Sequence, residues 1–241
     1  LGSATAYTNL ATTMEYSKES TRGKSELTAD IDNKTTGLDK DYATSWSYGI
    51  AETFTLLIPN FYGGASQGSL TTDSETYQAI KRVPNAKNLI KQLPLYWGAQ
   101  PFTSGPTYAG AIVMFLFILA FFLIKSEIRV WIIIATFMSI MLAWGKNFMP
   151  LTEFFLDYFP GYNKFRAVSM ILVVAEFTIP LFGFLALNKF LFDREEVIEK
   201  DLRGLDIKTK NISHQFDKSK KLSSIKLSFY FVGGLSLLFA L

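Results

Sequence analysis

Four long apolar runs constrain this chain more than any other feature. Residues 108–124, 130–145 and 227–241 contain no charged side chain, and residues 167–187 contain only Glu176. A helix needs about 20 apolar residues to cross the hydrocarbon core of a bilayer. Half of the chain is hydrophobic (49%), and these residues are clustered in the runs. We therefore expect a mainly α, polytopic helical membrane protein with spans at about 107–124, 129–145, 167–191 and 227–241.

The two ends predict partial spans. Residues 1–13 begin without methionine or a basic n-region and have the character of the end of a transmembrane helix, and the last apolar run stops at residue 241. The expectation is an internal fragment of a longer protein. It would have three complete and two partial transmembrane helices, a bundle over residues 107–241, and a mixed, loop-rich extracytoplasmic region over residues 14–106.

That extracytoplasmic region divides into three parts. Residues 18–40 are rich in Thr, Ser, Asn, Lys and Asp and predict a flexible connector, with order beginning near Trp46. A helical stripe (Ile50, Phe54, Leu57 and Ile58) predicts a helix that ends at Pro59. Asp73 or Ser74 is a candidate cap for a further helix that reaches Lys81, and Asn85 for a second one that ends before Pro94. The proline-interrupted residues 94–106 predict a folded loop with interfacial aromatics at Tyr96 and Trp97.

Residues 146–166 lie between two of the apolar runs. The apolar side chains of Leu151, Phe154, Phe155 and Tyr158 fall on one helical face. Pro150 is suited to a first helical turn, and Pro160-Gly161 to a helix end. We predict a short amphipathic helix over residues 150–159 that lies along the membrane surface.

Charge in the short loops predicts the orientation. The turn at residues 125–129 and the charged segment at 193–226 lie on one side and together hold eleven Lys or Arg, against three in residues 146–166. Positive charge favours the cytoplasm. Residues 193–226 are thus predicted to be a cytoplasmic loop. Residues 14–106 and 146–166 would face outward from a bacterial cytoplasmic (inner) membrane.

Composition excludes several kinds of site. With His214 as the single histidine, the chain alone can build neither a histidine metal cage nor a histidine-based catalytic triad, and we predict no metal. No glycine-rich phosphate loop identifies a cofactor. The net charge of +3 is too small to indicate nucleic acid. Membrane lipids are the partners that composition predicts.

Three cations near the outer surface are candidates for binding a lipid phosphate. Arg166 offers bidentate geometry, Lys164 a point charge, and Lys146 flanks the second span. The alternative for each is an ordinary anchor that extends its charge to the interface.

Three acids, Glu176, Glu52 and Asp41, are further candidates for a functional role. A carboxylate inside a span is costly, so Glu176 is expected to face the bundle or a water-filled cavity, either orienting a substrate group or packing beside Pro180. Glu52 and Asp41 fit solvated surface acids better than functional ones.

Three sequence segments resemble those of a known family: LIPNFYGG at 57–64, YWGAQPFTSGPTY at 96–108 and FPGYNKFRAVSMILVVAEF at 159–177. Together they resemble the YfhO-type bacterial membrane proteins, in a form similar to versions from Bacteroidetes-like bacteria. The resemblance implies a glycosyltransferase-like protein of the GT-C architecture. It would use a polyprenyl-phosphate-linked sugar donor and a cell-envelope glycan acceptor on the outer face.

The resemblance also bears on individual residues. It implies a catalytic acid in an outer loop outside this chain, so the catalytic residues are unknown and activity of the chain itself is left open. The dipeptide Phe165-Arg166 matches the Phe-Arg pair that lies at the start of a transmembrane span in this family. Many relatives carry a second arginine soon afterwards, where this chain has Ser169 and Met170, which puts a two-arginine phosphate clamp in question. The alternative function is a non-catalytic lipid-handling transporter or scaffold.

Overall fold

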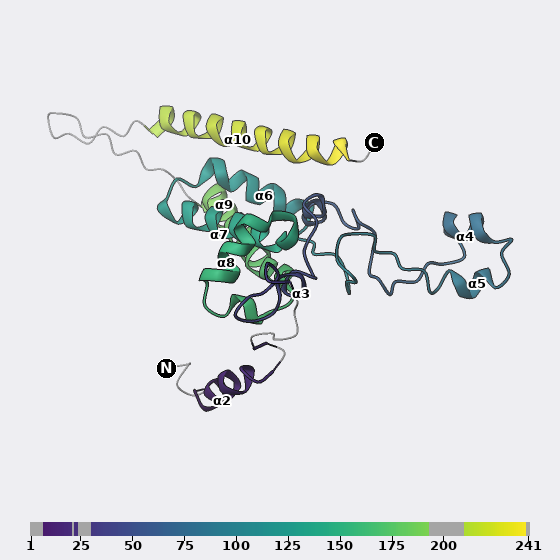
Figure 1. Cartoon of the computed structure of the whole chain (residues 1–241). Coiled ribbons are helices and arrows are strands. Elements are labelled where there is room, and N and C mark those ends of the chain that lie inside the picture. The colour runs from purple at the N-terminus through teal and green to yellow at the C-terminus, as the bar shows by residue number, and fades with distance from the viewer. Residues whose placement is uncertain (1–6, 21, 24–29, 193–209, 240–241) are drawn as a thin grey trace. The chain divides into compact units, whose positions relative to one another are not determined.

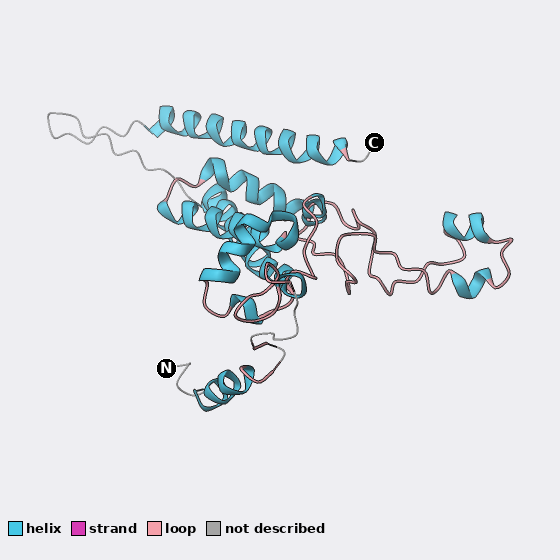
Figure 2. Cartoon of the chain, in the orientation of Figure 1, coloured by secondary structure: helices cyan, strands magenta, loops and turns pink. Residues whose placement is uncertain are grey.

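The computed structural model describes residues 7–20, 22–23, 30–192 and 210–239, and these residues are mainly helical (Figure 2). Among them the only β pairing is an isolated bridge between Phe61 and Gly63. The α-helices are α2 (Tyr7–Ser17), α3 (Lys40–Ala43), α4 (Glu75–Ile80), α5 (Ala86–Leu89), α6 (Ala111–Leu123), α7 (Glu127–Ala143), α8 (Met149–Tyr158), α9 (Leu172–Phe192) and α10 (Lys210–Leu238). Four 3₁₀ helices complete the order: η1 (Ala51–Leu56), η2 (Gly145–Phe148), η3 (Tyr162–Lys164) and η4 (Val168–Ile171). The mainly α class is confirmed.

One helix is long and apolar enough to cross a membrane. It covers Val168–Leu191, 24 residues that include η4 and most of α9. Helix α7 passes the same test only together with the segment Gly145–Tyr158, from which it is bent by 113°. Helix α6 has 13 residues and is about 20 Å long, against a hydrocarbon core of about 30 Å. Within the described residues, length and composition thus give one candidate span, or two if the bent pair is one span, and the predicted three complete and two partial spans are not confirmed.

The chain forms two compact units. Unit 1 consists of Leu1–Thr55, Asn60–Pro106 and Met138–Val173, and unit 2 of Leu56–Pro59, Thr107–Phe137 and Val174–Leu241. Helices α7 and α9 each pass from one unit into the other. One segment of unit 1 ends at Pro106, and the same unit also includes the end of α7, all of α8 and the start of α9.

Of the two predicted caps within unit 1, one is confirmed. The Ser74 side chain caps α4 by accepting a hydrogen bond from the Tyr77 backbone N–H, whereas Asn85 precedes α5 in a left-handed conformation and its side chain makes no cap hydrogen bond. These two short helices lie side by side at the end of the long excursion between residues 60 and 106 (Figure 1). The loop at residues 94–106 contains neither helix nor strand.

Helix α8 confirms the predicted short helix between the apolar runs. Pro150 lies in its first turn, and Gly161 after it has φ of 80°, in the left-handed region that favours glycine. Thr152 and Leu156 form its buried side, whereas Phe154 and Tyr158 of the predicted apolar face are 56% and 75% exposed. The aromatic face of α8 therefore remains uncovered by the described residues.

Unit 2 is a helical cluster centred on aromatic side chains. Phe117 and Phe121 of α6 each contact Phe182 of α9 edge to face, with ring centroids 5.6 Å apart. Thr136 of α7 and Thr178 of α9 share a buried hydrogen bond of 2.7 Å. Hydroxyl bonds of this kind hold helices together in apolar surroundings. Helix α10 lies along α6 (Figure 1).

Several predicted elements need correction. Order begins well before Trp46, because Leu38 is 3% exposed in a small core with Ala43 and Leu156. The helix expected near residues 47–58 is the six-residue 3₁₀ helix η1, which buries Glu52 and Thr55 and leaves Ile50 exposed.

Two boundaries move as well. Helix α6 begins at Ala111 rather than near 107, after Gly110 with φ of 103°. Residues 210–226 of the predicted cytoplasmic loop are the first part of α10, while residues 193–209 lie outside the described residues. The predicted terminal span at 1–13 falls partly on residues 1–6, also outside them. The described part belongs to α2, which continues to Ser17 and buries no side chain.

Candidate functional site

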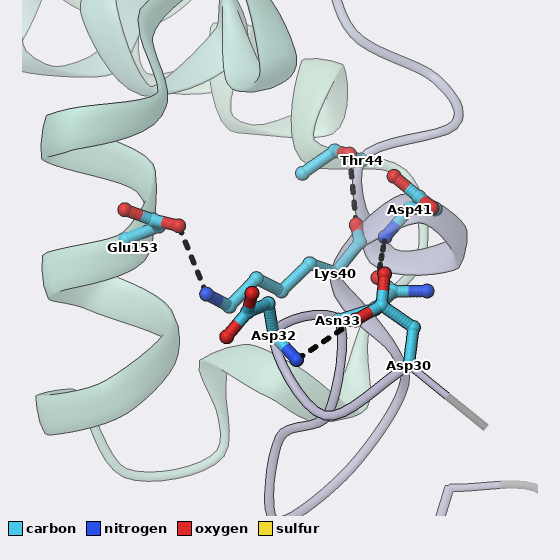
Figure 3. Close-up of polar contacts among 7 residues, drawn as sticks. All are labelled: Asp30, Asp32, Asn33, Lys40, Asp41, Thr44 and Glu153. Carbon is cyan, nitrogen blue, oxygen red and sulfur yellow. Dashed lines mark hydrogen bonds and ion pairs between the residues drawn. The ribbon is translucent and has the colours of Figure 1, made fainter. Parts of the chain in front are cut away.

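The connector docks onto α8 through an ion pair. Lys40 of α3 reaches Glu153 of α8 with Nζ and Oε1 2.9 Å apart (Figure 3). The hydrogen bond to Glu153 raises the pKa of Lys40, so the ammonium group stays charged at neutral pH. Beside it, the Asp41 backbone N–H donates to Asn33 Oδ1 over 2.9 Å and fixes the preceding turn. A surface pair contributes at most about 1 kcal/mol, so it orients the connector more than it stabilises it.

The turn after α8 holds the connector more firmly. Asn163, which is buried, donates from Nδ2 to Thr36 Oγ1 (2.8 Å) and accepts at its backbone carbonyl from the Leu38 N–H (2.9 Å). Lys164 Nζ donates to the backbone carbonyls of Thr36 (2.9 Å) and Arg22 (2.7 Å). These bonds bring residues 22 and 36–42 to the segment that leads into Arg166.

Arg166 lies against two aromatic rings. Its Cζ is 4.6 Å from the ring centroid of Trp46 and 5.6 Å from that of Tyr42. Its Nη1 donates to the Tyr42 hydroxyl over 3.0 Å. Trp46 is itself supported by Phe102, edge to face at 5.2 Å. Stacked guanidinium groups keep their in-plane N–H donors available for a planar or tetrahedral anion.

Arg166 shares a hollow with a second arginine. Arg22, Leu38, Tyr42 and Arg166 line an open space of about 330 Å³. Among the described residues, its lining thus contains two arginines and a tyrosine and no acid. We call it the arginine hollow. Arginine side chains offer fork-shaped N–H donors and a positive charge, which suit a phosphate group.

The other predicted cations take different positions. Lys164 donates to backbone carbonyls and serves the docking of the connector. Lys146 lies in η2, is exposed, and is fixed through its backbone N–H, which donates to Ser47 Oγ over 2.8 Å. Neither side chain lines the arginine hollow. Of the three cations that the sequence singles out, the structure places only Arg166 in it.

A buried carboxylate anchors the loop that supports Trp46. Glu52 is 2% exposed, and its Oε2 accepts from the Gly49 N–H over 2.9 Å. Its Oε1 accepts from the Tyr96 hydroxyl (2.7 Å) and from Gln100 Nε2 (3.4 Å). Burial, and then the bond to Glu52, raises the pKa of the Tyr96 phenol, which remains a donor. Both carboxylate oxygens are thus engaged in holding residues 96–100, just before Phe102.

Glu176 is exposed on α9 and is not turned into the helical cluster of unit 2. Of its two expected surroundings, the bundle interior and a water-filled cavity, the first does not fit this position. Helix α9 instead turns Ala175, Thr178, Ile179 and Phe182 inward, and Glu176 lies off that face. Within the part of the chain that the structure describes, no three His, Asp or Glu side chains gather to hold a metal ion.

Sequence reasoning overlooked Arg22 and undervalued Glu52. Arg22 lies in a polar stretch with no local pattern around it, and only the docking of the connector brings it to Arg166. Glu52 did carry a signal, because it is the single acid in the apolar stretch at residues 50–58. A lone carboxylate in such surroundings needs hydrogen-bond donors if it is buried. Tyr96, expected at the membrane interface, is one of these donors.

Comparison with known proteins adds no assignment: no family model, no curated protein and no solved structure matches this chain. The candidate site is therefore defined by its own geometry.

Proposed function

We propose that unit 1 binds the phosphate of a lipid-linked molecule at the membrane surface. The observation that carries the proposal is the arginine hollow, in which Arg22 and Arg166 meet the Tyr42 hydroxyl. The two arginines are 144 positions apart in the sequence and act as the paired clamp that the sequence around Arg166 lacks. Each charged hydrogen bond to a phosphate contributes about 1.5–3 kcal/mol.

The lipid nature of the ligand follows from the neighbouring aromatic surface. Phe154 and Tyr158 of α8, then Phe159 and Phe165, are all more than half exposed. Aromatic rings at this density are suited to the interfacial layer of a bilayer. Phe165 directly precedes Arg166, so a phosphate held there lies beside apolar surface that accommodates a lipid tail.

The fuller function is transfer of a sugar from a polyprenyl-phosphate donor to a cell-envelope glycan acceptor. In this proposal the chain is part of a multi-pass protein of a bacterial inner membrane, and residues 14–106 and 146–166 face outward. The arginines neutralise the phosphate that leaves the sugar carbon. A general base takes the proton of the acceptor hydroxyl. We assign no residue to that second task.

A non-catalytic role in lipid handling is the alternative, and Glu52 favours it. Both oxygens of this carboxylate accept hydrogen bonds from the surrounding backbone and side chains. Glu153 is paired with Lys40. Neither acid is placed to receive a proton from an acceptor. Binding without transfer by the full-length protein would support this alternative.

The test compares a polyprenyl phosphate with the corresponding polyprenol. Binding to the full-length protein in nanodiscs is measured for the wild type and for Arg22→Ala, Arg166→Ala and Arg82→Ala. Arg82 is the matched control, an exposed arginine outside the hollow. We expect the wild type to prefer the phosphate, and each hollow variant to lose about tenfold or more in affinity, while Arg82→Ala is unchanged. Equal binding of polyprenol, or unchanged binding by both hollow variants, contradicts the proposal.

A further inference from the structure

Helices α4 and α5 form a small hairpin that the proposed function does not use (Figure 1). In the turn between them, the Val83 N–H donates to the Ile80 carbonyl over 2.8 Å and the Ala86 N–H to the Val83 carbonyl over 3.2 Å. Ala86 and Ile90, which are four residues apart on one helical side, are 5% and 1% exposed. The hairpin is therefore an ordered element with a defined buried side.

Four cations are exposed on this hairpin. Lys81 and Arg82 directly follow α4, whereas Lys87 lies in α5 and Lys91 just after it. Lys81 Nζ donates to the neutral amide of Gln78 over 3.2 Å. Among the described residues, the side chains of the other three cations take part in no hydrogen bond or ion pair. Their charges are thus available to a partner.

The sequence of the hairpin contains few acids. No Asp or Glu occurs from Thr76 to Ser126, and the acids that come next before this range are Asp73 and Glu75. Both lie at the start of α4, whereas Lys81 and Arg82 lie at its other end. Residues 73–92 hold four positive and two negative side chains. The turn and the α5 half therefore favour an anionic partner.

Apolar side chains are exposed between the cations and distinguish a lipid surface from a soluble polyanion. Val83 and Leu89 are 47% and 41% exposed. A soluble acidic polymer would gain only from the positive charges. An anionic bilayer surface also removes aliphatic side chains from water, at the boundary between headgroups and acyl chains. Cations mixed with aliphatic side chains are thus better suited to lipid.

We propose that the α4–α5 hairpin docks on a bilayer surface that contains anionic phospholipids. The four cations bind headgroup phosphates, and Val83 and Leu89 enter the layer of the glycerol groups. The inference shares only the membrane location with the proposed function. None of these residues lines the arginine hollow, so the loss of Arg82 leaves that hollow intact, and either proposal can fail while the other holds.

The test places a fluorophore on the hairpin. The chain contains no cysteine, so Val83→Cys gives a single site for an environment-sensitive label on the full chain. The labelled protein is reconstituted into phosphatidylcholine vesicles with or without phosphatidylglycerol. We expect phosphatidylglycerol to shift the emission to the blue and to protect the label from acrylamide, a neutral quencher, and high salt to reverse both effects. A label at Ser69→Cys, exposed outside the hairpin, should not respond to phosphatidylglycerol.

Charge variants of the labelled protein test the lysines. Lys87→Gln and Lys91→Gln should each lower the ratio of docked to free hairpin roughly fivefold, because one cation near an anionic surface contributes about 1 kcal/mol. Lys18→Gln, in the connector, is the matched control and should leave the ratio unchanged. All three lysines are exposed, so these variants should fold normally.

Three results would overturn the proposal. An emission that does not respond to phosphatidylglycerol would show that the hairpin does not dock on lipid. An equal loss in Lys18→Gln would mean general attraction of the chain to a charged surface. A label that ignores phosphatidylglycerol but responds to soluble polyglutamate would identify an acidic polymer as the partner instead.

Discussion

The guanidinium of Arg166 lies 4.6 Å from the ring centroid of Trp46. Arg166 directly precedes the candidate span, and Trp46 lies shortly after the connector at residues 18–40. The contact therefore joins these two parts of the chain. Trp46 thereby becomes a positioning residue for the proposed phosphate site, because its ring limits the orientations of the guanidinium.

Replacing Trp46 with Leu should weaken phosphate binding while leaving the charge of the site intact. The loss of one cation–π contact at an exposed site is about 0.5–1 kcal/mol, or roughly a two- to fivefold rise in the dissociation constant for a polyprenyl phosphate. Trp97→Leu removes an exposed indole with no arginine on it, and we expect it to bind as the wild type does. Equal weakening in both variants would show that Trp46 does not position Arg166 for phosphate binding.

Glu52 should contribute to stability rather than to chemistry. Glu52→Ala leaves the partly buried Tyr96 hydroxyl and Gly49 N–H without their acceptor, at a cost of about 1 kcal/mol for each group. We expect a lower unfolding temperature in detergent and faster proteolysis within residues 94–106. Glu15→Ala, on the exposed helix α2, is the control. A Glu52→Ala protein that unfolds like the wild type would show that the carboxylate does not anchor this loop.

Gly145 should tolerate no side chain. Its φ is 47°, and an added Cβ would clash with the Ser47 side chain and lie 2.7 Å from Val168 Cγ2. Gly145→Ala therefore strains the backbone and pushes apart three segments that meet between α7 and α8. We expect a loss of about 1–3 kcal/mol in unfolding free energy. Gly105→Ala should cost far less, because a Cβ there would meet nothing within 4 Å. A similar loss of unfolding free energy in both variants would show that the close contacts around Gly145 do not cause the effect.

Sequence predicted the elements whose signals are local. The Ser74 cap, Pro150 in the first turn of α8 and Gly161 after its end each act within a few residues, and each appears where expected. The candidate span at Val168–Leu191 follows in the same way from composition.

The arrangement of the site depends on contacts that no local pattern contains. Lys164 binds the carbonyl of Arg22 across 142 positions, and Tyr96 donates to Glu52 across 44. Arg22 becomes part of the arginine hollow only after these tertiary contacts form. For the same reason the polar composition of residues 18–40 predicted a flexible connector, whereas Asn163 and Lys164 hold part of it in place.

We propose that residues 14–106 and 146–166 face outward from a membrane, and cysteine accessibility tests this orientation most directly. The chain contains no cysteine, so Ser69→Cys and Ser223→Cys each give a single exposed label site on opposite predicted sides. In intact cells, a membrane-impermeant maleimide should modify the full-length protein at position 69 and reach position 223 only after permeabilisation. Labelling of both positions in intact cells, or of position 223 alone, would contradict the proposed orientation.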